Sequence, residues 1–137
     1  MKHWDRAAQF FEHAYHLDPS LYGQIGLALS DGLAHRDREG LDILRALEQK
    51  IQQRGVGDPE AAYKIAQSYA VLHDNASAMR ALEYSIRNGF FAYPYLIADP
   101  LLEPARGDPQ WRPLMNMARQ RYEAFKRRIL LRSAILA

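Results

Sequence analysis

Apolar residues recur at intervals of three and four along most of this chain, which is the spacing of one face of an α-helix. Proline, glycine and short polar runs interrupt the pattern and divide it into segments. The pattern predicts helices over residues 5–18, 20–35, 41–54, 59–72 and 76–88, with polar turns at 37–40 and 73–75. No segment shows the alternation of a β-strand, so the predicted fold class is all-α.

The periodicity breaks after residue 90, where aromatic residues are dense and prolines follow in close succession. We expect short turns and one-turn helices here, packed by their own apolar side chains, because the segment is too apolar for a free linker. These side chains are Phe90, Phe91, Tyr95, Leu96, Leu101 and Leu102. Asp108 and Pro109 then suit the start of a long last helix from about residue 110.

The composition narrows the class of protein. The 137 residues are enough for one domain with one core, and the absence of cysteine excludes disulfides and thiolate metal sites. No apolar run approaches the roughly 20 residues that span a bilayer, and residues 1–19 lack the apolar region of a signal peptide. Together with a net charge of only +2, these features predict a cytoplasmic protein with no transmembrane segment, and they do not favour nucleic acid as a partner.

Small and bulky residues follow one another in the same order in three parts of the chain. A small residue inside a helix lets a second helix cross closely, and a bulky one fills the space beside the crossing. A repeated order of this kind is typical of stacked helical hairpins. The residues assigned to it are Ala7, Phe11 and Ala14, then Gly26, Leu29 and Leu44, then Ala66, Tyr69, Ala78 and Leu82.

This order resembles the tetratricopeptide repeat, although the chain lacks the consensus Trp of that family and the Gly of its turn. The resemblance implies one domain, 1–137, built as an α-solenoid of antiparallel helix hairpins with a long C-terminal capping helix. Its parts are a half repeat at 1–19, repeats at 20–55 and 58–90, and the closing segment with the capping helix at 91–137.

The stretch after residue 95 strengthens the resemblance. A Leu-x-x-Asp-Pro segment at 96–100, then Arg106, Asp108-Pro109 and Trp111, is similar to the ending of tetratricopeptide regions in bacterial multidomain regulators. Those regulators carry winged-helix, nucleotide-cyclase or Ser/Thr-kinase domains, none of which this sequence contains. Because the sequence begins in mid-repeat, we expect a C-terminal fragment of a longer signalling or transcription regulator. The alternative is a natural protein whose first helix is a cap.

In the tetratricopeptide family, the first helix of each pair lines a groove that binds a partner peptide. The residues that the resemblance places on this face are Leu27, Ser30, Asp31, Glu60, Tyr63, Gln67 and Val71. The Lys/Asn set that clamps a peptide carboxylate in chaperone-binding relatives is absent, so capture of chaperone tails is not expected. The expected partner is a protein, a peptide or another domain of the parent chain.

The sequence holds no motif of a catalytic or cofactor site. GxxxxGK, GxSxG and HExxH are absent, and no serine stands near a histidine–acid set. His13 and His16 have a spacing that lets two helical side chains share a metal, but no cysteine or acid completes the site, and two surface histidines are the simpler interpretation. We therefore expect no catalytic residue, no metal, no cofactor and no enzymatic activity.

Basic residues crowd the second half of the last helix, where Glu123 is the one acid. They are Arg119, Arg121, Lys126, Arg127, Arg128 and Arg132. Cations stabilise the C-terminal end of a helix through its dipole, so a solvated helix end is the first interpretation. A patch that binds nucleic acid or an anionic membrane is the alternative.

The apolar end of the chain, residues 129–137, predicts packing on a neighbouring domain or on a second subunit, which would make the chain a homodimer. The leading hypothesis is a non-catalytic interaction or regulatory scaffold module. A basic-surface binder and a homo-oligomerisation module remain the competing hypotheses.

Overall fold

The computed structural model describes residues 4–54 and 58–135, and every regular element in this part of the chain is a helix. The predicted all-α class is therefore confirmed for the described residues. The elements are α1 (Trp4–Leu17), α2 (Leu21–Leu33), α3 (Asp37–Arg54), α4 (Pro59–Val71), α5 (Asn75–Arg87), α6 (Tyr93–Ala98), the 3₁₀-helix η1 (Pro100–Ala105) and α7 (Trp111–Ile135). The first five begin and end within about one turn of the bounds that the apolar pattern predicts.

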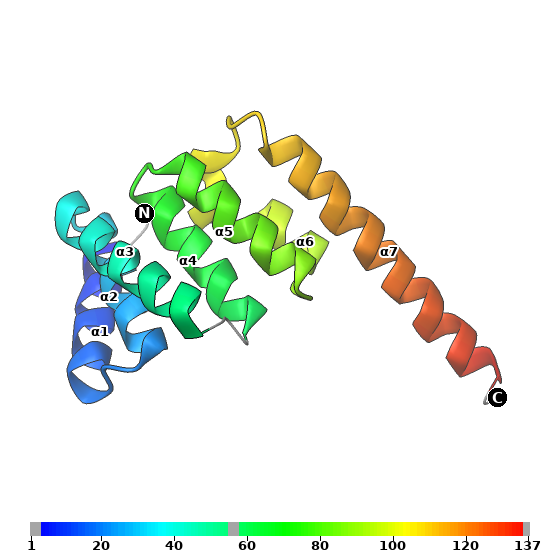
Figure 1. The fold of residues 1–137 in the computed structure, drawn as a ribbon, viewed down its shortest axis with the longest axis horizontal. Coiled ribbons are helices and arrows are strands. Elements are labelled where there is room, and N and C mark those ends of the chain that lie inside the picture. The colour runs from blue at the N-terminus through cyan, green and yellow to red at the C-terminus, as the bar shows by residue number, and fades with distance from the viewer. Residues whose placement is uncertain (1–3, 55–57, 136–137) are drawn as a thin grey trace.

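The helices stack in chain order, as Figure 1 shows. Helix α2 packs on α1, α3 and α4, and α4 pairs with α5. Beyond this pair, η1 covers α4, and α7 packs on α5 and α6 before it runs away from the body (Figure 1). The largest buried apolar side chains of the core are Leu44, Leu47, Tyr69, Met79, Leu82, Ile86, Leu96 and Leu102.

Side-chain caps explain where the central helices begin. A carboxylate oxygen of Asp58 accepts a hydrogen bond from the Glu60 amide at 2.9 Å, and Pro59 occupies the first turn of α4, as predicted. Asp74 caps α5 in a similar way, with its carboxylate 3.1 Å from the Ser77 amide. The boundaries of these helices are thus set by local chemistry.

The predicted polar turn at 37–40 is wrong, because these residues form the first turn of α3. Gly40 is buried at this point, and a Cβ added to it would lie 3.0 Å from the carbonyl oxygen of Ala28 and from the side chain of Leu72. Helices α2 and α3 therefore cross closely at Gly40, where a side chain would crowd both neighbours, and Gly40 serves a helix crossing rather than a turn.

Helices α2, α4 and α5 end in the same hydrogen-bonded motif. After α2, the Arg36 amide donates to the Asp31 carbonyl at 2.8 Å and the His35 amide to the Gly32 carbonyl at 3.2 Å. The second residue past each helix then takes a positive φ. These residues are His35 (58°), His73 (60°) and Gly89 (126°). Histidine is strained in this left-handed region, whereas glycine is not.

Replacing His73 with glycine is expected to raise the free energy of unfolding by roughly 0.5–1 kcal/mol. The gain is the relief of left-handed strain, about 1–2 kcal/mol, less the greater chain entropy that glycine brings to the unfolded state. Urea denaturation measures the difference. His16→Gly, at an exposed position of α1, is the control and should lower stability. A His73→Gly protein no more stable than wild type would contradict the strain argument.

The hairpins α2–α3 and α4–α5 correspond at a constant spacing of 38 residues. Each pair of equivalent residues has the same place in its hairpin, whether cap, turn or buried contact. The pairs are Ser20 and Asp58, Ala28 and Ala66, Ser30 and Ser68, His35 and His73, Gly40 and Ala78, and Leu44 and Leu82. Two hairpins of one design therefore follow each other in the chain.

This correspondence corrects the register proposed for the first hairpin. The sequence interpretation equates Gly26 with Ala66, but the residue 38 positions before Ala66 is Ala28, and both alanines are fully buried. Gly26 instead faces α1, where an added Cβ would lie 3.1 Å from Phe11 Cδ1. Of the other packing residues named above, Leu29, Leu44, Ala66, Tyr69, Ala78 and Leu82 are buried.

Helix α1 also contacts α2 through a different face than predicted. Ala8 is buried and its carbonyl accepts a hydrogen bond from Ser30 Oγ at 3.1 Å. Ala7 and Phe11 are only half-buried, and Ala14 is exposed. The direction in which α1 crosses α2 decides which alanine is covered, and sequence spacing alone does not encode it.

The closing segment forms the two short helices α6 and η1, as expected, and buries Leu96, Leu102 and Ala105. Tyr95 departs from the prediction, because 74% of its surface is exposed. In a helix of six residues, a residue next to the buried Leu96 points about 100° away from it. The short α6 therefore covers one of these two side chains and leaves the other in solvent.

Candidate functional site

The predicted partner-binding face is partly closed at its α2 end. Ser30 is buried and donates to α1, as described above. Asp31 is also buried and accepts a hydrogen bond from Arg36 Nε at 2.8 Å. Both placements correct the expectation of an open face, because α1 covers this side of α2 and the chain satisfies both polar groups itself.

The same face is closed over part of α4 by the closing segment. The Tyr63 hydroxyl and the Gln67 side-chain amide both donate to Oδ2 of Asp99, the latter at 2.6 Å. Phe90 stacks on the Tyr63 ring with centroids 4.6 Å apart. Tyr63 is only 7% exposed, which corrects its predicted place on an open face. The aspartate of the Leu-x-x-Asp-Pro segment thus fastens the closing segment to α4.

The remaining residues of the predicted face are spread around it. Glu60 is exposed, with its carboxylate 3.8 Å from Lys64 Nζ. Leu27 and Val71 are half-buried, and Val71 packs near Gly32. Gln67 is the one predicted residue that also lines the groove between α1, α2, α4 and η1.

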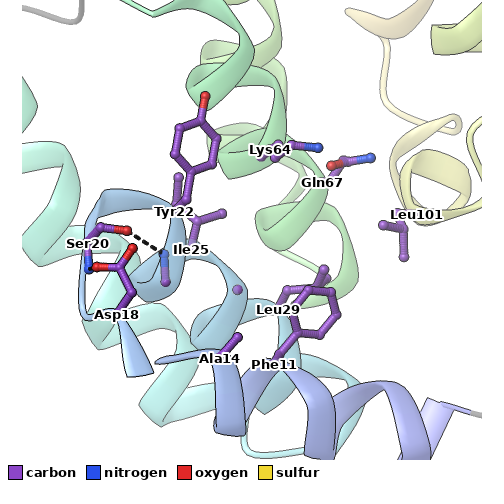
Figure 2. A pocket seen from close by; sticks show the side chains of 12 residues that line it. Phe11, Ala14, Asp18, Ser20, Tyr22, Ile25, Leu29, Lys64, Gln67 and Leu101 are labelled. Carbon is purple, nitrogen blue, oxygen red and sulfur yellow. Dashed lines mark hydrogen bonds between the residues drawn. The ribbon is translucent and has the colours of Figure 1, made fainter. Parts of the chain in front are cut away.

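This groove has a volume of about 490 Å³ and is the best candidate for a binding site in the described chain. Its polar lining is Asp18, Ser20, Tyr22, Lys64 and Gln67, and its apolar lining is Phe11, Ala14, Ile25, Leu29 and Leu101, with Gly23 and Gly26 between them. Figure 2 shows Phe11 and Leu29 on one side and Lys64, Gln67 and Leu101 on the other, around an open centre. The groove is therefore apolar at its floor and polar at its border.

Two of the three glycines of α2, Gly23 and Gly26, lie in the wall of the groove. A Cβ on Gly23 would lie 2.1 Å from the carbonyl oxygen of Asp18, a distance that no side chain permits. Gly26 faces the ring of Phe11 in the same way. Glycine lowers helix propensity, but here it lets α1 and the turn after it approach the α2 backbone.

Hydrogen bonds fix the charge at the border. The Tyr22 hydroxyl donates to Oδ2 of Asp58, and this bond is the main reason that the pKa of Tyr22 rises to about 12. The same bond lowers the pKa of Asp58. The bond favours the ionised form of Asp58. The lining itself holds one acid, Asp18, and one base, Lys64. Asp58 and Glu60 contact the lining residues Tyr22 and Lys64, and with these two carboxylates counted the border is acidic on balance.

The buried tyrosines predict a loss of stability in alkaline solution. Burial, and then the hydrogen bond to Asp99, raises the pKa of Tyr63, and burial, then the bond to Glu48, raises that of Tyr69. Both remain neutral in the folded state while the unfolded chain ionises near pH 10. The stabilisation that the two neutral tyrosines contribute is complete below about pH 10. It is lost as the pH rises toward their folded pKa, and each tyrosine lowers the free energy of unfolding by up to about 1.4 kcal/mol per pH unit.

Urea denaturation at a series of alkaline pH values measures this effect. The double variant Tyr63→Phe/Tyr69→Phe should be less stable than wild type at neutral pH, because it leaves Asp99 and Glu48 without these donors. Its stability should also fall less steeply above pH 10. Parallel slopes for the two proteins would show that these tyrosines do not carry the alkaline transition.

The basic residues of α7 do not form one uniform patch. Arg121 donates to the Arg87 carbonyl at 2.7 Å and lies 5.2 Å from the Phe91 ring centre. Lys126 lies 3.7 Å from the Glu123 carboxylate and near the Tyr122 ring. Arg121 and Lys126 are exposed, as are Arg119, Arg127 and Arg128, and the side chain of Arg132 is outside the described residues.

Apolar side chains remain exposed where α7 leaves the body. Phe125 is 51% and Ile129 is 50% exposed, and Leu130 and Leu131 are exposed further still. Leu114, Met115 and Ala118 of the same helix are buried against α5 and α6. Leu130 and Leu131 are therefore mostly in solvent, and a role of the apolar end in pairing two chains stays a prediction.

Two further findings concern metals and membranes. Within residues 4–54 and 58–135, no three His, Cys, Asp or Glu side chains gather as a metal ion requires, and His13 and His16 are exposed on α1. In the same described part, each helix is too short or too polar to traverse a bilayer. Whether the chain acts without a cofactor remains a prediction.

Comparison with known proteins gives no relative: no protein-family model, curated protein or solved structure matches the chain. The groove must therefore be interpreted from its own residues. Sequence reasoning assigned Phe11, Ala14 and Leu101 to packing and did not single out Lys64. Lys64 is three residues before Gln67 on α4, so the helical spacing could have placed it on the same face. The position of Leu101 depends on how η1 folds back onto α4.

Proposed function

We propose that this chain is a non-catalytic protein-interaction module and that the groove between α1, α2, α4 and η1 binds an apolar segment of a protein partner. The observation that carries the proposal is the division of the groove into an apolar floor and a polar border, beside which Asp58 and Glu60 contact Tyr22 and Lys64. Such a surface recognises apolar side chains flanked by basic residues. It places no pair of groups within a closed pocket, as acid–base or nucleophilic catalysis requires.

The resemblance to the tetratricopeptide family is part of the proposal. It is supported by the 38-residue correspondence of the two hairpins and by the packing of α2 directly on α4. In this architecture, the first helices of successive hairpins line the inner face, and the groove lies along α2 and α4. The proposed parent is a bacterial signalling or transcription regulator, in which the module docks a partner or another domain of the same protein.

Binding of nucleic acid or membrane through α7 has less support. Arg121 and Lys126 are already engaged with groups of the same chain, and exposed apolar side chains lie among the remaining cations. Binding of nucleic acid or membrane through α7 also gives the apolar groove no role. A protein partner accounts for both surfaces.

A peptide library displayed on phage tests the proposal. Peptides selected on the wild-type protein should carry apolar residues next to Lys or Arg, and their affinity should fall roughly tenfold or more for Ala14→Arg, which fills and charges the groove. His13→Arg adds the same charge beside the groove and should leave affinity unchanged, because His13 is exposed and does not line it. Peptides that bind both variants equally would place the binding site elsewhere.

A further inference from the structure

Charge is divided unevenly between the body of the molecule and its last helix. Residues 111–137 contain seven basic residues and one acid, for a net charge of +6. Residues 1–110 contain eleven basic and fifteen acidic residues, for a net charge of −4. The small net charge of the whole chain therefore conceals an acidic body and a basic arm, which attract each other.

The apolar stripe of α7 becomes more exposed toward the end of the helix, although the Phe125 ring still meets the edge of Phe91, with centroids 6.0 Å apart. Leu114, Met115 and Ala118 are buried against α5 and α6, and the same face of the helix continues through Phe125 and Ile129, each about half exposed. Arg128 borders this stripe on one side, next to Arg121, which donates to the Arg87 carbonyl. Lys126 borders it on the other side and lies 3.7 Å from the Glu123 carboxylate. The distal half of α7 is thus an amphipathic helix with basic borders.

The groove offers the complementary surface. Its floor is apolar and Asp18 is part of its lining. Asp58 and Glu60 lie just outside it, where they contact the lining residues Tyr22 and Lys64. In a single molecule, the distal half of α7 cannot reach it, because α7 ends on the opposite side of the body from α1 and α2 (Figure 1). Contact between the two surfaces therefore requires two copies of the chain.

We infer that the distal half of α7, centred on Phe125 and Ile129, docks into the α1–α2–α4–η1 groove of a second copy of the chain. The inference rests on the proposed function of that groove and names its occupant. The contact is head-to-tail, since one copy contributes the helix and the other the groove. Pairing of α7 with α7 is disfavoured, because it would bring two helices of charge +6 together.

Light scattering after size exclusion, over a range of concentrations, tests the contact through two single variants. Ile129→Glu places a charge on the docking face of α7, and Ala14→Arg places one in the groove. Each variant alone should therefore be monomeric, while the wild-type protein forms dimers and larger species. An equimolar mixture of the two variants should form dimers and nothing larger, because one intact helix meets one intact groove. High salt should weaken the wild-type association, since the borders carry opposite charges.

Matched controls separate this result from loss of folding. Leu131→Glu places the same charge on the opposite face of α7, and His13→Arg the same charge beside the groove, and both should associate like wild type. Circular dichroism should show equal helix content for all four variants. A symmetric contact, in which Ala14→Arg still dimerises and the mixture gains nothing, would overturn the inference.

Other outcomes discriminate between the two proposals. If selected peptides bind the groove while the wild-type chain is monomeric at all concentrations, the docking of α7 is wrong and the proposed function stands. If the chain is monomeric and no peptide maps to the groove, both fail. A different result is a chain that stays monomeric and binds phosphatidylserine vesicles or DNA. If the double variant Arg127→Glu/Arg128→Glu loses that binding, α7 recognises an anionic surface and the inference is overturned.

Discussion

Truncation of Leu82 to alanine is expected to lower the free energy of unfolding by about 2–5 kcal/mol. Leu82 is fully buried in α5, within the core that joins both hairpins and the closing segment. Removing its terminal carbons loses the transfer free energy and leaves a cavity that the surrounding helices fill only in part. Urea denaturation monitored by circular dichroism measures the change as a shift of the midpoint.

Two further variants are compared with Leu82→Ala. Leu44 is the equivalent residue in the first hairpin and is equally buried, so Leu44→Ala should cost about the same. Leu17→Ala is the control, because Leu17 is 74% exposed and its truncation should change stability by no more than about 0.5 kcal/mol. If Leu82→Ala and Leu17→Ala unfold alike, the assignment of Leu82 to the core is wrong.

Enlargement of Ala66 or Ala78 to leucine is expected to destabilise the protein by about 1–3 kcal/mol each. Both alanines are fully buried in the pair formed by α4 and α5. The added carbons have no space at such a contact, so the helices must separate or the side chain must leave its preferred rotamer. Thermal and urea denaturation measure the loss.

Ala46→Leu is the matched control for these two variants. Ala46 is exposed on α3, so the same substitution adds a good helix former without crowding and should be close to neutral. Wild-type stability of both Ala66→Leu and Ala78→Leu would exclude close packing at these alanines. It would also remove the main support for the tetratricopeptide-like architecture.

The starts and ends of the helices were predictable because local chemistry sets them. Asp58 and Pro59 identify the start of α4 on their own, through a side-chain cap and a fixed backbone angle. Asp108 and Pro109 form the turn just before α7, which begins at Trp111, and the Asp108 carboxylate accepts a hydrogen bond from the Gln110 amide at 2.8 Å. Interactions over two or three residues can be recognised from their order alone.

The glycines show where this local reasoning fails. Gly40 was predicted to turn the chain, yet it lies within α3, where a side chain would crowd a carbonyl oxygen of α2, twelve residues earlier. Gly26 was assigned to the crossing of a hairpin, yet it faces Phe11 of α1. Glycine is used both for backbone freedom and for close approach, and the sequence does not say which until the neighbouring helix is in place.

The candidate site was predictable only in part for the same reason. The sequence indicated the faces of α2 and α4, but Tyr63 lies beneath Asp99, 36 residues further along the chain. The groove that stays open lies between helices far apart in sequence, and its floor includes Phe11 of α1 and Leu101 of η1. No local pattern shows which helix covers which part of a face.

The sequence by itself determined the all-α class, the helix boundaries other than the start of α3, the apolar stripes and the separation of acidic body from basic helix. Each of these follows from periodicity, capping or composition, which act within a few residues. Only the tertiary structure decided that Asp99 closes part of the α4 face, that Gly23 and Gly26 admit α1 to the groove wall, and that the stripe of α7 continues past the body. These features depend on the directions in which helices cross, which packing between distant residues selects.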